Sequence, residues 1–433
     1  MNTEVEGLAT AGETASTQAS GRGLFSGASR DQIGVAAACL TGNLISPTPI
    51  IYGPIGLFLI PIATEFGWPR EQVSGVLGPF ALVMALAYPF IGRLADHFGP
   101  RRMIQFGNLA FGCCVIALGF SQPNPVLFYG LFALIGAVGS LPSSMMYTRV
   151  VSGWFDKTRG AILGVTAGLG NGVGATIMPI LALVLMSWFG WRGAFIGLGV
   201  LVLAVGVPVL ALFLKEPPTE RATRAAPAAP LEGLTLPQAA RTPIFWLILV
   251  AICLCAGCLT AVMAHIVPIL TDRHIPVAES TVVVSTFALV TAVFQIIVGF
   301  LLDRAGSPKL VAPLYLAALA GMLLLDLGTT MPVYVLGGAL MGVGMGTEYG
   351  ALPYFISRYF GLRRFGAIAG VMYSAVIVAQ GITPYLMDVD FDHHRSYLLS
   401  LHVVDGVLIA GATILALLPR YAATKRLWQV VAA

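Results

Sequence analysis

The chain contains 433 residues, of which 57% are hydrophobic and 10% are charged, and its mean hydropathy is +0.86. So few charged side chains cannot cover the surface of a soluble protein of this length, which excludes a soluble enzyme or a nucleic-acid-binding protein. The composition instead indicates an integral membrane protein that crosses the bilayer many times. The positions of the basic residues are more informative than the formal net charge of +4.

The first 31 residues are rich in Ser, Thr, Gly, Ala and Glu and lack the apolar core of a signal peptide. We expect them to form a disordered cytoplasmic tail. The apolar runs that follow are long enough to span the hydrocarbon, which takes about twenty residues per helix. They predict an all-α protein with twelve transmembrane helices, near residues 33–62, 73–92, 102–121, 124–150, 160–188, 192–214, 243–271, 279–302, 309–328, 331–356, 366–386 and 396–418.

The basic residues give an independent indication of topology. If both termini are cytoplasmic, 20 of the 24 Lys and Arg residues lie at cytoplasmic ends and loops, and only 4 lie outside. Basic residues favour the cytoplasmic side, and one miscounted helix would invert every later loop. The asymmetry therefore predicts a multi-pass protein of the cell inner membrane with both termini in the cytoplasm.

Residues 215–242 are polar and rich in Pro, Ala and Glu, which indicates a cytoplasmic linker. The linker separates an N-terminal six-helix half, 32–214, from a C-terminal six-helix half, 243–418. Residues 419–433 would form a second cytoplasmic tail.

The 6 cysteines all fall within apolar stretches, so we expect buried thiols rather than a disulfide framework. Cys253, Cys255 and Cys258 would spread around a helix axis, which argues against a metal site. Nothing in the sequence indicates a cofactor.

Two motifs occur once in each half. Gly92-Arg-Leu-Ala-Asp96-His-Phe-Gly99-Pro-Arg101-Arg102 corresponds to Gly299-Phe-Leu-Leu-Asp303-Arg304-Ala-Gly306-Ser-Pro-Lys309. The segment from Arg149 to Gly164 likewise corresponds to the segment from Arg358 to Gly370, and both would join a fourth helix to a fifth. The chain therefore reads as two copies of one membrane unit.

Parallel six-helix repeats with this first motif after the second helix resemble the major facilitator superfamily, over essentially the whole membrane portion. The resemblance implies that the motif is a latch closing the two halves at the cytoplasmic face. It implies that Asp96 pairs with Arg149 and Asp303 with Arg358. The residues expected to gate the protein are Gly92, Arg93, Asp96, Gly99, Arg101, Arg102, Arg149, Asp303, Arg304 and Arg358.

The two latches are expected to differ. The second motif lacks the paired arginines of the first, so we expect the N-terminal latch to be the stronger. For four arginines an equally good alternative is that their charges only set topology and solvate a loop; these are Arg101, Arg102, Arg363 and Arg364.

A narrower likeness rests on the segment from Glu65 to Ser74 and on Gly190-Trp191-Arg192. These resemble the monocarboxylate porter and oxalate:formate antiporter branch, which implies transport of an organic, possibly aromatic, carboxylate. The chain departs from that pattern at Gln295, where those porters typically carry an Arg. A Gln donates hydrogen bonds but cannot neutralise a carboxylate, so the substrate charge would have to be met by His265 or Arg149, or else a larger substrate would be recognised mainly by apolar and aromatic surface.

Ionisable residues at bilayer depth cost about 2.5 to 3.5 kcal/mol each on insertion scales, so they indicate function. Glu348, within helix ten, is the candidate proton carrier, and His265, in helix seven, is a candidate for proton coupling or substrate binding. The alternatives are a hydrogen-bonded carboxyl that only packs two helices and a histidine tied to a neighbouring carbonyl.

Helix one carries Pro47, Pro49 and Pro54, which interrupt its hydrogen-bond ladder, and interrupted helices at membrane depth generally line a cavity. Side chains next to the break are therefore candidate substrate contacts. Two tyrosines on helices four and eleven are further candidates, for which packing between helices is the alternative role. The complete candidate substrate site is Asn43, Ser46, Tyr52, Tyr147, Arg149, His265, Gln295 and Tyr373.

We therefore expect a monomeric secondary transporter that takes up a small organic anion together with protons by alternating access. Efflux of drugs or metabolites on the same fold is the alternative, and a sensor that binds without transporting is a third. No Ser-His-Asp set or metal-ligand spacing appears at a membrane surface, which argues against an enzyme.

Overall fold

The computed structural model describes residues 29–217, 233–305 and 307–421. Most of the expected N-terminal tail, the linker and the C-terminal tail lies outside these residues. The N-terminal half consists of α2 (Arg30–Leu44), η1 (Thr48–Tyr52), α3 (Ile55–Phe66), α4 (Arg70–Ser74), α5 (Leu77–Phe98), α6 (Pro100–Leu118), α7 (Pro125–Gly139), α8 (Ser144–Trp154), α9 (Arg159–Leu163), η2 (Gly164–Leu169), α10 (Gly170–Leu201), η3 (Val202–Gly206) and α11 (Val207–Phe213).

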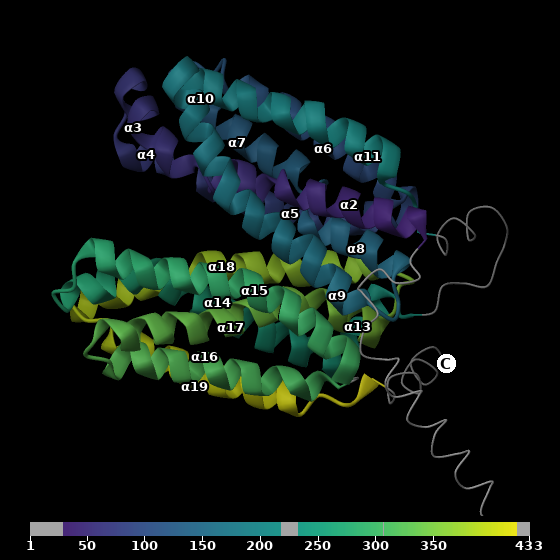
Figure 1. Cartoon of the computed structure of the whole chain (residues 1–433), viewed down its shortest axis with the longest axis vertical. Coiled ribbons are helices and arrows are strands. Elements are labelled where there is room, and N and C mark those ends of the chain that lie inside the picture. Colours follow the sequence, from purple (N-terminus) through teal and green to yellow (C-terminus); the bar gives the residue numbers. More distant parts are fainter. Residues whose placement is uncertain (1–28, 218–232, 306, 422–433) are drawn as a thin grey trace, which may run out of the picture.

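The C-terminal half is also helical throughout its described residues. After the short α13 (Leu236–Ala240) it contains α14 (Pro243–Asp272), α15 (Val277–Ala305), η4 (Pro308–Leu310), α16 (Val311–Leu327), α17 (Met331–Phe355), η5 (Ile356–Phe360), α18 (Phe365–His394) and α19 (Leu398–Ala416). The two halves lie side by side, with α5 against α18 and α9 against α15 (Figure 1).

Nine helical stretches of the described chain are long and apolar enough to cross a membrane. One of them, Arg159–Phe213, has 55 residues, more than twice what one crossing needs, and its backbone leaves helical geometry at Gly190, where φ is 67°. Its two arms pack on different partners, because Gly174 meets Leu44 and Gly199 meets Ile116. With α6 and α17 as further helices of membrane-spanning length, the arrangement is consistent with the predicted twelve.

Helix one is interrupted as its prolines predict. The α2 helix ends at Leu44, a π-helical turn follows from Thr48 to Tyr52, and α3 begins at Ile55. Since Pro47 and Pro49 cannot donate to the ladder, the backbone between them takes the wider turn. Asn43 and Ser46 are thereby placed beside the break.

At the end of the molecule where α9 and α13 lie, which we call the latch end, the two halves are in contact; their ribbons diverge toward the opposite, far end (Figure 1). Glycines make the contact close. A Cβ added at Gly92 of α5 would collide with the carbonyl oxygen of Gly366 of α18, and one added at Gly299 of α15 would collide with that of Gly160. The first glycine of each repeated motif thus lies against the other half.

The end of the linker also packs at the latch end. Gly233 forms an isolated antiparallel bridge with Gly361, and the Leu234 amide donates to the Phe360 carbonyl at 2.8 Å. Thr235 and Gln238 then form a capping box that starts α13. The end of the linker therefore packs against the C-terminal half at the latch end.

The α18 helix is longer than the sequence predicts. It was expected to end near residue 386, but it continues to His394, so Asp388 and Asp390 belong to a helix rather than to a loop. Large apolar side chains such as Leu82, Phe90 and Phe106 are exposed on the outer surface. Such a surface suits lipid rather than water.

Candidate functional site

The first latch joins Asp96 of α5 to the start of α18. The Asp96 carboxylate accepts the amide N–H groups of Gly366 at 3.1 Å and Ala367 at 3.0 Å, and the Arg149 guanidinium donates to it at 2.5 Å. No side chain of α18 itself caps that helix. Asp96 therefore acts as the N-cap of a helix in the other half, where its charge also interacts favourably with the helix dipole.

The second latch repeats this arrangement in the opposite direction. Asp303 of α15 accepts the amide of Gly160 at 2.9 Å and that of Ala161 at 2.8 Å. Both are in the first turn of α9, which likewise has no capping side chain of its own. Each half thus caps one helix of the other.

The expected ion pair of Asp96 with Arg149 is confirmed, but the expected pair of Asp303 with Arg358 is wrong. Arg358 donates to Asp156 of the N-terminal half instead, at 3.2 Å to its carboxylate and 2.9 Å to its carbonyl. Asp156 also pairs with Arg159, so one carboxylate bridges two arginines across the halves.

The remaining residues of the first motif shape the turn or face outward. Gly99, at φ 85°, ends α5 and starts α6, a conformation that only glycine adopts readily. Arg101 donates to the carbonyl of Ala211. Arg102 and, in the second motif, Arg304 are exposed. The paired arginines therefore make no described contact with Asp96, and the basic residue that pairs with it is Arg149.

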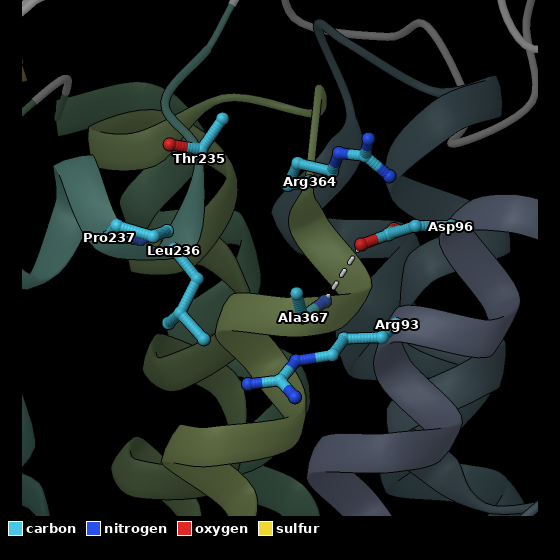
Figure 2. A pocket seen from close by; sticks show the side chains of 7 residues that line it. All are labelled: Arg93, Asp96, Thr235, Leu236, Pro237, Arg364 and Ala367. Atoms are coloured by element: carbon cyan, nitrogen blue, oxygen red, sulfur yellow. Dashed lines mark hydrogen bonds between the residues drawn. The ribbon is translucent and has the colours of Figure 1, made fainter.

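A cavity of about 280 Å³ adjoins the first latch. In Figure 2 the Arg93 side chain extends toward the residues at the end of the linker, whereas the Arg364 side chain extends away from them, on the side of Asp96. The lining residues are Arg93, Asp96, Thr235, Leu236, Pro237, Arg364 and Ala367. The end of the linker and the latch residue Asp96 thus line the same cavity.

Tyrosines gather along the seam between the halves. Tyr88 of α5 and Tyr373 of α18 meet edge to face with ring centroids 6.4 Å apart. Tyr52, beside the helix-one break, is 39% exposed. Tyr349 of α17, which is 41% exposed, lies 3.5 Å from the Gln380 amide of α18. Sequence reasoning found Tyr52 and Tyr373 but missed the other two, which lack any local signal.

The predicted contacts Asn43 and Ser46 belong to a polar network inside the N-terminal half. The Ser144 hydroxyl donates to Asn43 at 2.6 Å, and Asn171 of α10 donates to Ser144 at 2.9 Å. The Ser46 hydroxyl donates to Asn171 at 3.3 Å. The network joins helices one, four and five. The sequence indicated Asn43 and Ser46, but it gave no sign that Asn171, a polar residue among glycines, belongs with them.

Six of the eight predicted substrate residues are buried in this state, among them Tyr147, Arg149 and Gln295. Tyr147 is fully buried against the position of Gly42. Arg149 is 6% exposed and committed to Asp96. Gln295 is 7% exposed, and its side chain packs against Gly168 of the other half. A ligand would reach these groups only after the halves separate.

Glu348 is buried within the C-terminal half. Its side chain is 1% exposed, and neither carboxyl oxygen has a hydrogen-bond partner among the described residues. Cys255 of α14 and Tyr315 of α16 lie near enough to interact with its charge. Seventeen residues separate it from the start of α17, which places it about 25 Å from the far end. The structure therefore does not show Glu348 in its alternative role, that of a hydrogen-bonded carboxyl that only packs two helices.

His265 is paired with a residue that the sequence did not suggest. Its Nδ1 lies 2.7 Å from the Ala261 carbonyl oxygen, and its Nε2 lies 2.8 Å from the Asp388 carboxylate. The contact with the Ala261 carbonyl agrees with the alternative role, a histidine tied to a neighbouring carbonyl. The sequence did not predict the contact with the Asp388 carboxylate. Asp388 was missed because helix eleven was expected to end before it.

The two motifs of the narrower likeness meet at the far end. Glu65 accepts from Arg192 at 3.0 and 2.8 Å and from the Trp191 indole at 2.5 Å. Arg192 also donates to the carbonyls of Gly119 and Ser121. Burial alone would raise the pKa of Glu65, but the hydrogen bonds from Arg192 and Trp191 outweigh it, so that the pKa lies below its ordinary value. This cluster ties together three helix ends of the N-terminal half.

All 6 cysteines are free, and Cys113 is exposed, so the expectation that every thiol is buried is wrong for that residue. Within residues 29–217, 233–305 and 307–421, no group of three or more His, Cys, Asp or Glu residues is placed to hold a metal ion.

The fold has relatives among solved structures. The human organic anion transporter MFSD10 superimposes with a TM-score of 0.66 over 89% of this chain and 99% of that chain, at 17% sequence identity. At that identity the likeness speaks for the fold alone.

Sequence comparisons agree with the fold. The uncharacterised MFS-type transporter YcxA of Bacillus subtilis is 23% identical over 356 residues, which are 80% of this chain and 85% of that protein. Human monocarboxylate transporter 11 is 24% identical over 408 residues, 89% and 82% of the two chains. A probable sulfoacetate transporter of Cupriavidus necator is 32% identical over 160 residues, 36% of each. The family model of the Major Facilitator Superfamily matches residues 41–384, and the chain therefore belongs to that superfamily of membrane transporters.

Proposed function

We propose that this transporter carries a small organic carboxylate together with protons by alternating access. The observation that supports it most is the reciprocal capping by Asp96 and Asp303, in which each carboxylate holds two amides of the other half. Such contacts can be broken as a unit when the halves rock, because they involve only helix ends and glycine seams. The same two latches account for closure at one end.

We assign the latch end to the cytoplasm. Its basic residues, among them Arg93, Arg304 and Arg364, outnumber those at the far end, and basic residues favour the cytoplasmic side. On this assignment the chain is closed toward the cytoplasm, both termini are cytoplasmic, and a substrate arriving from outside reaches Asp388 and His265 before the seam pair of Tyr88 and Tyr373. An importer takes up its substrate from outside in such a conformation.

Two buried groups support proton coupling. His265 lies near the far end, about 10 Å from the end of α14, and Glu348 lies deeper. A carboxyl with no partner and an imidazole held by a carboxylate are both groups whose proton can be gained or lost as the cavity changes sides. The carboxylate assignment is supported by His265 and by relatives named as monocarboxylate and sulfoacetate transporters.

Uptake into proteoliposomes tests this proposal. Purified protein would be reconstituted and offered radiolabelled lactate, benzoate and other monocarboxylates, with and without an inward proton gradient. We expect accumulation of at least one carboxylate that the gradient stimulates. A protein that moves none of them, or moves them equally without the gradient, overturns the proposal.

A further inference from the structure

Both ring nitrogens of His265 face oxygen acceptors. The Ala261 carbonyl cannot donate, so Nδ1 must carry a proton to bond it at 2.7 Å. The bond between Nε2 and Asp388 at 2.8 Å then needs a second proton, either on the imidazole or on the carboxyl. The pair is therefore built to hold a proton between α14 and α18.

Asp388 lies toward the far end of α18. It follows Tyr373 by fifteen residues, a rotation of about 60° around the helix axis and a rise of about 22 Å. Tyr373 contacts Tyr88 of the other half. The side chain of Asp388 is 63% exposed, whereas that of His265 is 7% exposed. The carboxylate thus covers the imidazole while most of its own surface stays exposed.

Other charged groups near this pair have their own partners or face elsewhere. Asp390 accepts from His394 at 2.8 Å and also from Ser400. Arg273 bonds Asp326 of α16 at 3.1 Å. The ring of Tyr397, 5.5 Å from that of His265, covers one side of the imidazole. The remaining titratable side chains on α14 and the segments packed against it near the far end are Asp272 of α14, Glu279 of α15, His393 and Arg395 at the end of α18, and His402 and Asp405 of α19.

We infer that the Asp388 carboxylate occupies the position in which the substrate carboxylate binds, and that these two carboxylates compete for the Nε2–H of His265. When Asp388 takes up a proton, it loses its charge and releases the imidazolium. The incoming carboxylate then accepts the Nε2–H, so that one proton and one anion enter together. On release to the cytoplasm, Asp388 gives up the proton and recovers its bond to His265.

This inference rests on the proposed function and adds its coupling step. It explains how the chain manages without an Arg at Gln295, because the positive charge is that of His265, which protonation of Asp388 frees to meet the substrate carboxylate. A substrate that binds without the proton would leave two carboxylates facing one imidazolium, which disfavours uncoupled uptake.

The test uses the full chain in proteoliposomes with labelled benzoate and lactate, and compares gradient-driven accumulation with exchange at equal pH. Wild type should accumulate label about tenfold per pH unit, as expected for one proton per anion. Asp388→Asn should lose this accumulation, with a ratio near 1, while exchange continues. His265→Gln should lose both. Asp390→Asn, an aspartate on the same helix bonded to His394 and Ser400, is the matched control and should behave as wild type.

Benzoate-induced infrared difference spectra of the purified protein give a readout that does not depend on transport. Wild type should show protonation of one carboxyl on benzoate binding, and Asp388→Asn should lack that band. Gradient-driven accumulation in Asp388→Asn equal to that of wild type, or an unchanged carboxyl band, overturns the coupling assignment alone. A wild type that neither exchanges nor accumulates either probe overturns the proposed function, and the inference falls with it.

Discussion

The carboxylate of Asp96 accepts the amide of Ala367 at 3.0 Å, although the two residues are 271 positions apart and belong to different halves. Asp303 accepts the amide of Ala161 in the same way. The two motifs that repeat in the sequence are therefore not parallel copies that act separately. The aspartate in the first motif of each half accepts hydrogen bonds from backbone amides in the second motif of the other half.

Removing Asp96 should open the first latch. Asp96→Ala leaves the first amides of α18 without acceptors and leaves Arg149, which is 6% exposed, as a buried charge without its carboxylate, at a cost of about 3 to 5 kcal/mol. Hydrogen exchange at residues 365–370 should become faster, as measured by mass spectrometry. Arg102→Ala, at an exposed position, is the control; unchanged exchange in Asp96→Ala would contradict the latch.

The second latch should respond less. Asp303→Ala removes two backbone contacts but no direct ion pair, since Arg358 is bonded to Asp156. The loss should be about 1 to 3 kcal/mol, the penalty for leaving buried donors unsatisfied. Exchange at residues 159–163 should accelerate by a smaller factor than exchange at 365–370 does in Asp96→Ala. The opposite order would contradict the inequality of the latches.

The glycine seam should tolerate no side chain. In Gly299→Ala the new methyl group would meet the carbonyl of Gly160, so the halves must separate at the latch end. We expect greater accessibility of that end to added protease and slower gradient-driven uptake. Gly78→Ala on α5, where an added Cβ meets nothing within 4 Å, should keep the wild-type behaviour; identical results for both variants would show that the seam has no role in closure.

Glu348 should be needed for coupling rather than for folding. Glu348→Gln keeps the shape of the side chain and removes the exchangeable proton, and neither oxygen loses a described partner. Expression and thermal unfolding should change little, while gradient stimulation of uptake should disappear. Glu279→Gln, at an exposed position, is the control. Full gradient stimulation in Glu348→Gln would return Glu348 to a packing role.

The far-end cluster should give a small contribution to stability that depends on pH. Since the pKa of Glu65 is lowered on folding, the ion pair with Arg192 stabilises the protein fully above the unfolded pKa of about 4.3. The stabilisation is lost as the pH falls through the folded pKa. Because both side chains are partly exposed, it should be less than about 1 kcal/mol. The difference in melting temperature between wild type and Glu65→Gln should therefore be constant at pH 6 to 8 and shrink below about pH 4; a constant difference down to pH 3 would contradict it.

The sequence predicts much of the fold because bilayer thickness, proline chemistry and basic-residue asymmetry are all local signals. The break after Leu44 follows from Pro47 and Pro49. The end of α18 could not be predicted, because Asp388 and Asp390 look like loop residues although their side chains have partners on α14 and α19. Helix ends set by such tertiary contacts leave no mark in hydropathy.

The site was predicted in part for the same reason. Asp96, Arg149 and His265 are recognisable because charges are rare in apolar helices. The partners of Arg358 and His265 depend on how two helices far apart in sequence face each other. Tyr88 and Ser144 likewise become site candidates only when the seam and the polar network are seen.

The most direct test of the central claim is to follow proton and carboxylate fluxes in the same proteoliposomes, with a pH-sensitive dye inside and labelled carboxylate outside. The account predicts one proton per carboxylate in wild type, with net proton flux lost in both Glu348→Gln and Asp388→Asn. Carboxylate influx in wild type without matching proton influx would contradict it.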